Sequence, residues 1–364
     1  MEKAKRIVLA VGVVLVSAAC ASAQDWPQWR GPNRDAKIRG FAAPQTWPKE
    51  LTLQWKTAVG LGDATPALVG RRLYVFARQG DEEVAMCLNA DDGKEIWRDK
   101  HPAPAVTGGP AQHSGPRSTP TVADGKVVTL GVAGVLTCLD ADDGKILWTK
   151  DEFPGAWPRF YAAMSPIAVD GLVVAHLGKE GAGAIVAYDL ATGNPKWKWS
   201  GGGPTYASPV LMTLDGVKTL VVHAETDLVG LAGADGKLLW QVAVPTRQRF
   251  YSSVTPIVDG QTLIYTGQGT GMKAIRIEKT GDGYGAKELW SNEDIGTGYN
   301  TPVLKNGLLF GISDPGNYLF CMNAHDGKML WTDTTKYGRF GTMVDAGPVL
   351  FALPVSDLIV IEPS

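Results

Sequence analysis

The clearest chemical potential in this sequence lies in two copies of an arginine followed by two aromatic residues. Arg159-Phe160-Tyr161 and Arg249-Phe250-Tyr251 each begin six residues before a Ser/Thr-Pro step, at Ser165 and at Thr255. Arginine beside aromatic rings suits carboxylates, planar ligands and peptide segments, through bidentate hydrogen bonds and cation–π contacts. The two copies therefore form a candidate binding surface if the fold brings them together.

Three further side chains stand two residues before a Ser/Thr-Pro step of their own, and we expect them to share the same surface. The full set of predicted binding residues is Arg117, Arg159, Tyr161, Tyr206, Arg249, Tyr251 and Tyr299. The alternative is structural. The aromatic rings would fill a channel opening, and the arginines would pair with Asp63, Asp294 or Asp345.

No other set of residues points to catalysis or to a metal. No nucleophile motif accompanies the scattered histidines, which are His101, His113, His176, His223 and His325. Three cysteines occupy the same local position in a repeat, which favours a small buried apolar residue over a redox role: Cys87, Cys138 and Cys321. The sequence therefore predicts no catalytic residue and no metal site.

The Ser/Thr-Pro steps belong to a repeat that sets the architecture. They recur about every 47 residues, from Thr65-Pro66 to a degenerate seventh copy at Gly347-Pro348. Each step opens an apolar run ending in a turn such as Asp124-Gly125, whose glycine allows the positive φ of a tight hairpin. A unit of this length with four short strands and no helical period is one blade of a β-propeller.

Seven strands of the repeat end in tryptophan, which predicts packing between neighbouring blades rather than ligand stacking: Trp55, Trp97, Trp148, Trp197, Trp240, Trp290 and Trp331. We therefore expect an all-β propeller of four-stranded antiparallel blades, seven in number, or eight if the chain is truncated. The run Leu358–Glu362 lacks a following hairpin. The N-terminal strand Leu51–Lys56 is expected to supply the missing outer strand and close the ring, which would hide two sheet edges.

The first 23 residues are predicted to be a signal peptide. Lys3, Lys5 and Arg6 precede an apolar run that is too short for a membrane span, and Ala21-Ser22-Ala23 supplies a cleavage site. Residues 24–364 would then form one propeller domain, secreted or periplasmic. Lipid attachment at Cys20 is the alternative.

The composition favours many short strands and excludes nucleic acid as a partner. The chain has 364 residues with 44 Gly, 23 Pro and 12 Trp, a mixture of turn formers and large flat side chains. Its formal net charge is −2, so the chain has no excess of basic residues that would favour nucleic-acid binding. We expect no transmembrane span in the mature chain.

The repeated Ser/Thr-Pro step, Asp-Gly turn and Leu-Asp-Ala-x-x-Gly-Lys-x-Leu-Trp pattern resembles the PQQ-like β-propeller repeat family. The resemblance covers about residues 50–362, and Trp26–Pro32 is similar to the opening of many exported bacterial members. This family includes quinoprotein alcohol dehydrogenases and the propeller lipoprotein of the outer-membrane β-barrel assembly machinery. The resemblance implies the fold strongly and the activity weakly, because function resides in sites.

Two functions follow from this resemblance. The first is a non-catalytic, monomeric scaffold that binds a protein or peptide partner in the cell envelope. The alternative is a dehydrogenase that uses pyrroloquinoline quinone (PQQ) with Ca²⁺, held by a Glu, an Asn and an Asp. No such set stands apart from the turn residues here, and no adjacent Cys-Cys pair is present. The sequence therefore favours the scaffold.

Overall fold

Strands account for nearly all the regular structure. The computed structural model describes residues 24–363 except 245–251, 268–269, 339 and 356. This part of the chain forms 27 strands and one short 3-10 helix, η1 (Gly109–His113).

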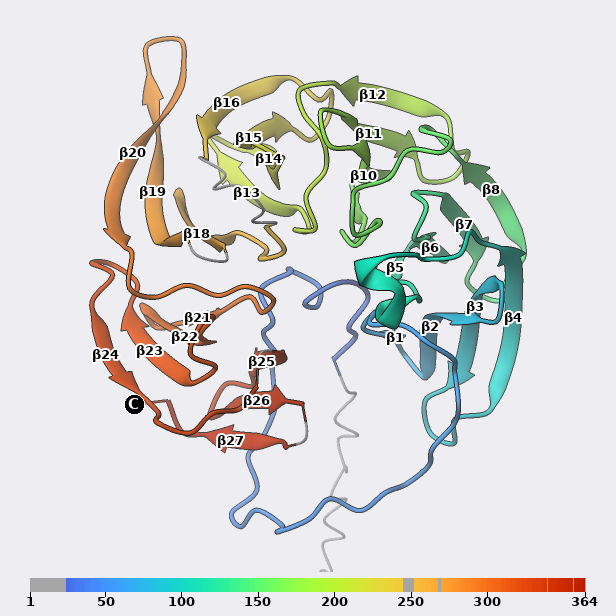
Figure 1. Ribbon diagram of the computed structural model, residues 1–364, viewed down its shortest axis with the longest axis horizontal. Coiled ribbons are helices and arrows are strands. Elements are labelled where there is room, and N and C mark those ends of the chain that lie inside the picture. The colour runs from blue at the N-terminus through green and yellow to red at the C-terminus, as the bar shows by residue number, and fades with distance from the viewer. Residues whose placement is uncertain (1–23, 245–251, 268–269, 339, 356, 364) are drawn as a thin grey trace, which may run out of the picture.

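The strands form seven antiparallel sheets arranged as blades around a centre (Figure 1), which confirms the predicted propeller and its blade number. Six sheets have four strands and the seventh has three. Blade 1 consists of β1 (Ala67–Val69), β2 (Arg72–Gln79), β3 (Glu82–Asn89) and β4 (Glu95–Pro102), and blade 2 of β5 (Thr121–Ala123), β6 (Lys126–Leu130), β7 (Leu136–Asp140) and β8 (Ile146–Lys150). Blade 3 consists of β9 (Ile167–Val169), β10 (Leu172–Lys179), β11 (Ala182–Asp189) and β12 (Pro195–Trp199), and blade 4 of β13 (Val210–Leu214), β14 (Val217–His223), β15 (Asp227–Ala232) and β16 (Leu238–Ala243).

The remaining blades follow the same course from the centre to the rim. Blade 5 consists of β17 (Ile257–Asp259), β18 (Thr262–Gly267), β19 (Gly271–Thr280) and β20 (Gly283–Asn292). Blade 6 consists of β21 (Val303–Lys305), β22 (Leu308–Ile312), β23 (Leu319–Asn323) and β24 (Met329–Thr332), and blade 7 of β25 (Gly341–Asp345), β26 (Leu350–Pro354) and β27 (Ile359–Ile361).

The middle strands of each blade are apolar on both faces because each blade packs between two neighbours. One core cluster joins Leu130 and Cys138 of blade 2 to Val173 and Ala175 of blade 3. The three repeat cysteines are free and buried, as predicted. Burial raises the pKa of Cys138 to about 12, so this thiol stays protonated and acts as an apolar filler.

The Ser/Thr-Pro steps link one blade to the next through their hydroxyl groups. The backbone N–H of Thr119 donates to Ser165 Oγ at 2.9 Å, and the N–H of Ser165 donates to Ser208 Oγ at 2.9 Å. Thr255 N–H donates to Thr301 Oγ1 in the same way, at 3.1 Å. The hydroxyl residue therefore recurs because the backbone of the preceding blade needs an acceptor there.

The tryptophans that end the outer strands also join neighbouring blades, as predicted. Trp97 Nε1 donates to the Ala141 carbonyl of the next blade at 3.0 Å. Its ring lies on the turn glycine of that blade, so close that a Cβ at Gly144 would come within 2.5 Å of it. The same hydrogen bond runs from Trp148 to Leu190 and from Trp290 to Ala324.

Closure of the ring by an N-terminal strand is not shown. Residues 51–56 form no strand, and the sheet of blade 7 ends at β27. Leu51 and Leu53 are 74% and 75% exposed, so the expected apolar face of this segment has no partner surface among the described residues. Trp55 alone keeps the repeat's role: its Nε1 donates to Ala90 O of blade 1 at 3.0 Å.

Candidate functional site

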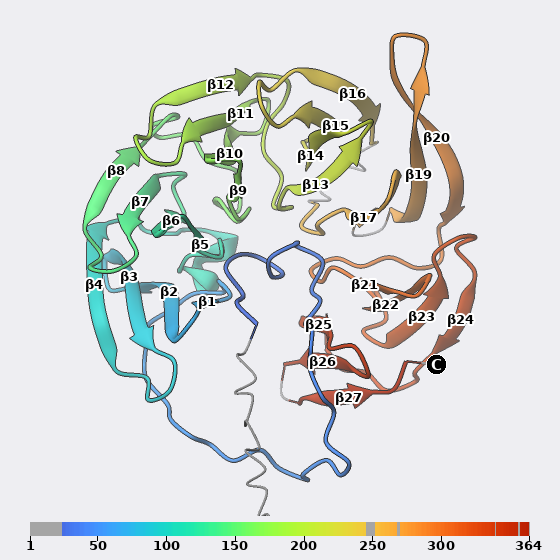
Figure 2. The same cartoon turned by 180° about the vertical axis from the view of Figure 1, so that it is seen from behind.

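Residues 24–40 run into the middle of the ring and hydrogen-bond to all seven blades. Figure 2 shows this N-terminal segment crossing the centre. Its backbone reaches three blades. Trp26 N–H donates to Leu68 O in β1 at 2.7 Å, Pro27 O accepts from Val122 in β5 at 2.8 Å, and Ile38 N–H donates to Asp345 O in β25 at 2.7 Å.

Side chains of the same segment reach the other four blades. Arg34 donates to Ser165 O and Pro166 O of blade 3 and to Pro209 O of blade 4. Arg30 donates to the carbonyls of Thr301 and Pro302 of blade 6, at 2.9 Å each. The Trp29 indole donates to Thr255 Oγ1 of blade 5, at 2.9 Å. The acceptors all belong to Ser/Thr-Pro steps, so these steps hold the central segment as well as the neighbouring blade.

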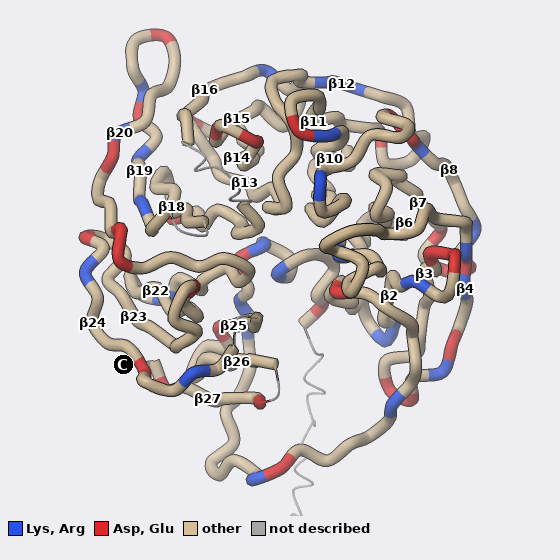
Figure 3. The backbone as a smooth tube through the Cα atoms, in the orientation of Figure 1, with Lys and Arg blue, Asp and Glu red and all other residues tan. Residues whose placement is uncertain are grey.

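Two buried positive charges follow from this arrangement. Arg30 and Arg34 are 7% and 4% exposed, and within the described ranges neither forms an ion pair. Desolvation lowers the pKa of Arg30 to about 10, opposed by Asp35, and lowers the pKa of Arg34 to about 9. Figure 3 shows basic positions on the segment at the centre of the ring, whereas both signs of charge alternate along the rim.

Three of the predicted binding residues converge on Phe160. Arg117 Nη1 donates to the Phe160 carbonyl at 2.6 Å, and Phe160 N–H donates to Tyr206 Oη at 3.0 Å. The Tyr206 ring meets the Phe160 ring edge-on at 6.1 Å, and the Arg159 guanidinium lies 5.7 Å from the same ring. These loops precede β5, β9 and β13, so the structure brings together side chains from three blades.

The contacts continue to Tyr299 through an exposed aromatic pair. The rings of Tyr299 and Phe340 lie 5.1 Å apart, and Phe340 lies 6.4 Å from His113. The His113 carbonyl accepts from Arg117 Nη2 at 2.6 Å. We call this set the mouth band; its members are His113, Arg117, Arg159, Phe160, Tyr206, Tyr299 and Phe340.

The structure places the other predicted residues elsewhere. Tyr161 is 6% exposed, stacks on Trp157 at 5.7 Å and accepts a hydrogen bond from Thr107 N–H at 3.0 Å. Its side chain is therefore buried and is not part of the exposed surface of the band. Arg249 and Tyr251 lie outside the described residues.

Two of the three carboxylates expected to pair with the arginines have other partners. Asp63 lies 3.1 Å from His113 Nδ1, and Asp345 lies 2.8 Å from Lys305 Nζ. Arg117 is held by backbone carbonyls, and burial lowers its pKa.

Sequence reasoning missed Phe340 and His113 in the band, and Arg30 and Arg34 in the centre. His113 was one of five scattered histidines. Phe340 belongs to Arg339-Phe340, a third Arg-Phe pair that follows Arg159-Phe160 and Arg249-Phe250 at the same spacing of 90 residues, and this repeat was the available signal. Arg30 and Arg34 lie within or beside the opening motif at Trp26–Pro32, which was the available signal.

The residues do not fit a site for Ca²⁺ and a quinone. Across the described ranges, no group of three or more His, Cys, Asp or Glu side chains could hold a metal ion. The segment at residues 24–40 occupies the centre of the ring. Of the helices described, none is long and apolar enough to cross a membrane.

The seven blades, their interblade tryptophans and their Ser/Thr-Pro steps define a β-propeller of the PQQ-like repeat class. The family model described as outer membrane protein assembly factor BamB matches residues 48–208 and 81–333. The chain belongs to this family.

Individual relatives agree with this assignment. The chain is 26% identical over 261 residues to the outer membrane protein assembly factor BamB of Moranella endobia, which covers 66% of this chain and 63% of that protein. It is 25% identical over 384 residues to BamB of Burkholderia pseudomallei, covering 94% and 92%. The chain thus spans just under two thirds of the first relative and nearly all of the second.

A solved enzyme shares the fold. The quinohemoprotein alcohol dehydrogenase ADHIIG of Pseudomonas putida HK5 superposes with a TM-score of 0.67 at 15% identity, covering 90% of this chain and 69% of the enzyme. This likeness shows the propeller alone.

Proposed function

We propose that this protein is an exported, non-catalytic β-propeller that serves as an assembly scaffold in the cell envelope, and that the mouth band binds its protein partner. The observation that carries the proposal is the band itself, which gathers arginine and aromatic side chains from several blades on one rigid ring. The family's description as an outer membrane assembly factor supports the scaffold role.

The chemistry of the band suits a peptide segment. Tyr299 and Phe340 are 45% and 48% exposed, and aromatic and arginine side chains dominate the binding energy of protein interfaces. Arg159 is exposed on the same band and could take a partner carboxylate in a bidentate hydrogen bond.

Ordering of the mouth band on binding should cost little conformational entropy. Arg117 bridges the carbonyls of His113 and Phe160 at 2.6 Å each, which fixes two loops before any partner arrives. A preorganised surface retains more of its interaction energy as affinity.

The location proposed for the protein is the periplasm. Residues 1–23 would direct export, and Cys20 is the site of lipid attachment in the alternative form. Intact mass of the protein purified from its native envelope distinguishes a chain starting at Gln24 from an acylated chain starting at Cys20.

The partner experiment compares matched arginine variants. The Arg159→Ala/Arg249→Ala double variant and Tyr299→Ala should each weaken capture of the other components of the outer-membrane β-barrel assembly machinery, with roughly tenfold or greater loss of affinity for a lost hot spot. Arg276→Ala, an exposed change in β19, is the control. Equal capture by all folded variants would refute the mouth band as the partner site.

The second candidate is a quinoprotein dehydrogenase, which shares the propeller fold but for whose Ca²⁺ the described residues offer no site. Titration of pyrroloquinoline quinone with Ca²⁺, followed by dye reduction with alcohols or sugars, tests it directly. Absence of binding at high micromolar cofactor would remove this candidate, whereas tight binding with turnover would displace the scaffold proposal.

A further inference from the structure

Blade 1 carries a row of ionisable side chains that lies outside the mouth band. Arg78 in β2 is opposite Glu83 in β3, and Glu83 is opposite His101 in β4. Directly opposite residues of antiparallel strands place their side chains on the same face of the sheet. Arg78 and Glu83 are 5% and 2% exposed, whereas the His101 side chain is 24% exposed. The row is therefore buried at its centre and reaches solvent at His101.

His101 lies between two carboxylates. Its Nε2 is 3.6 Å from Glu83 Oε2, and its Nδ1 is 3.9 Å from Asp99 Oδ2. Asp99 Oδ2 is buried and has no hydrogen-bond partner among the described residues. Arg78 donates to the Pro104 carbonyl at 2.7 Å. With a neutral imidazole one arginine faces two carboxylates, and protonation of His101 balances these charges.

The Glu83 carboxylate also reaches blade 2. Its Oε1 accepts from the backbone N–H of Val132 at 2.8 Å. Gly131 permits this approach, because a Cβ at that position would lie 2.2 Å from Glu83 Oε2. The two loops beside the row add no titratable side chain, since residues 131–135 are Gly-Val-Ala-Gly-Val and residues 103–107 are Ala-Pro-Ala-Val-Thr.

Val132 connects this row to the mouth band. Its carbonyl accepts from Ala162 N–H at 2.9 Å, and its side chain packs with Tyr161 in a buried cluster. Tyr161 directly follows Phe160, on which the residues of the band converge. Val132 is therefore bonded to the buried carboxylate through its N–H and to the loop of the band through its carbonyl.

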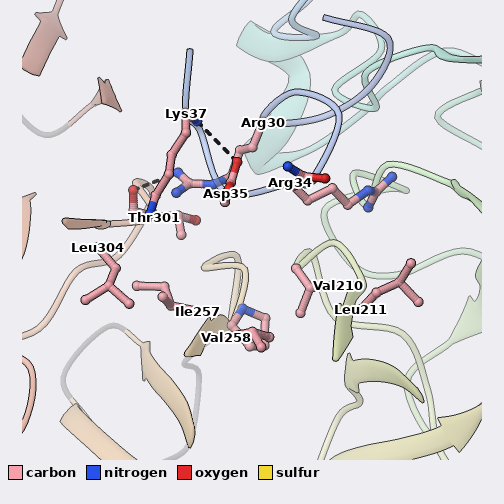
Figure 4. A pocket seen from close by; sticks show the side chains of 12 residues that line it. Arg30, Arg34, Asp35, Lys37, Val210, Leu211, Ile257, Val258, Thr301 and Leu304 are labelled. Carbon is pink, nitrogen blue, oxygen red and sulfur yellow. Dashed lines mark hydrogen bonds between the residues drawn. The ribbon is translucent and has the colours of Figure 1, made fainter. Parts of the chain in front are cut away.

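The central arginines and the other buried histidines keep one charge state near neutral pH. Figure 4 shows Arg30 and Arg34 with Asp35 at the pocket beside the N-terminal segment. Burial lowers the pKa of Arg30, opposed by Asp35, to about 10 and that of Arg34 to about 9, so both stay charged. Burial lowers the pKa of His176 and of His223 to about 4, so both stay neutral.

We propose that the Glu83–His101 pair regulates the mouth band by pH. A protonated His101 balances the buried carboxylate and keeps it on Val132, which fixes the loop that carries Phe160. A neutral His101 leaves the carboxylates in excess, and burial of an unbalanced charge is costly. Glu83 then turns toward solvent and releases Val132. The effect on partner binding rests on the proposed function, whereas the effect on the loop does not.

The direction of the pH effect follows from the position of His101. The nearby Glu83 carboxylate raises the pKa of His101 above the usual 6.5 by favouring the charged imidazolium, although burial opposes this shift. The stabilisation is therefore fully present below pH 6.5 and is lost as the pH rises through the pKa of the folded protein. Mild acid should order the loop, and mild base should loosen it.

Hydrogen exchange of the full protein tests the loop directly, read by mass spectrometry at about pH 6 and about pH 8 and corrected for the intrinsic exchange rate. Protection of residues 130–135 and 158–162 should be roughly threefold to tenfold lower at the higher pH, the range for loss of one hydrogen bond. His101→Gln keeps a donor beside Glu83 but cannot take up a proton, so its protection should not depend on pH. His325→Gln, at an exposed turn in blade 6, is the matched control and should follow the wild type.

A wild type whose protection at these residues does not change with pH would overturn the proposal, and so would an unchanged pH dependence in folded His101→Gln. Capture of the assembly-machinery components is measured separately and should be tighter at the lower pH in the wild type only. Capture that ignores pH, while Tyr299→Ala still weakens it, would also overturn the proposal. If Tyr299→Ala leaves capture unchanged, the mouth band fails as the partner site, and the exchange experiment still decides the effect on the loop.

Discussion

Two buried histidines should make this propeller sensitive to acid. His176 in β10 and His223 in β14 are both 4% exposed. His176 Nε2 lies 3.1 Å from Gly202 O, and His223 Nδ1 lies 2.9 Å from Ser252 Oγ. Desolvation lowers the pKa of each to about 4 from the usual 6.5.

The sign and size of the effect follow from these pKa values. Below pH 6.5 the unfolded chain takes up a proton at each histidine, whereas the folded chain does so only near pH 4, so acid favours unfolding across that window. Between neutral pH and pH 5 the free energy of unfolding should fall by about 2 kcal/mol per histidine, or about 4 kcal/mol for both.

Replacing both histidines by leucine tests this reasoning. Leu130 stands eleven residues after its Ser/Thr-Pro step, as His176 does, so blade 2 already carries leucine at this position. Urea unfolding followed by Trp fluorescence at about pH 7.5 and about pH 5 gives the loss directly. Between these pH values the free energy of unfolding should fall by about 4 kcal/mol less in the double variant than in the wild type.

The control for this experiment is an exposed histidine in a turn. His325→Asn also removes one histidine, but at an exposed turn position and not in a blade core. If the free energy of unfolding falls by the same amount in acid for the wild type and for the His176→Leu/His223→Leu variant, the effect does not come from these two histidines.

Three further changes probe the ring and its centre. Gly144→Ala places a Cβ within 2.5 Å of Trp97 and should lower the unfolding free energy by about 2–4 kcal/mol, whereas Gly125→Ala, also at positive φ but with open space, should cost about 1 kcal/mol. Equal losses in urea unfolding would contradict the packing argument. Arg34→Ala removes hydrogen bonds to three carbonyls and should cost about 3–5 kcal/mol, measured in the same way; a loss below about 1 kcal/mol would show that the segment is not held by this side chain. Trp97→Phe keeps an aromatic ring but removes one of three donors to the Ala141 carbonyl, which retains Arg72 Nη1 at 2.7 Å and Tyr74 Oη at 3.3 Å. It should cost about 0.5–1.5 kcal/mol; a neutral result would mean that ring packing alone matters.

The repeat made the propeller predictable because six blades open on the same Ser/Thr-Pro step. The predicted seventh step, Gly347-Pro348, was misplaced: it lies between β25 and β26 and does not open the seventh blade. The Ser/Thr-Pro step, the Asp-Gly turn and the final Trp each perform a contact between blades, so their spacing reported the sheet count. The ring's closure was not predictable in this way. Residues 51–56 have an apolar pattern typical of a strand, but only Trp55 has a partner in blade 1.

The candidate site was predictable only in part. Arg117, Arg159 and Tyr206 converge because they precede equivalent inner strands, which spacing alone revealed. Tyr161 shares that spacing, yet its backbone has a φ of 67°, and its ring is buried beside Trp157. The central arginines could not be placed because they donate to backbone carbonyls, which leave no trace in the sequence.

The central segment changes how the ring behaves as a folding unit. In an array of repeats each unit contacts only its neighbours, so damage in one unit can remain local. Here residues 26–38 hydrogen-bond to every blade, so blades on opposite sides of the ring share one set of partners. The segment is synthesised before all seven blades, but its last partner, Asp345, is made some three hundred residues later. Until Asp345 is made, the central segment, with its two arginines, lacks its full set of hydrogen-bond acceptors. The blades should therefore become stable together and not one after another.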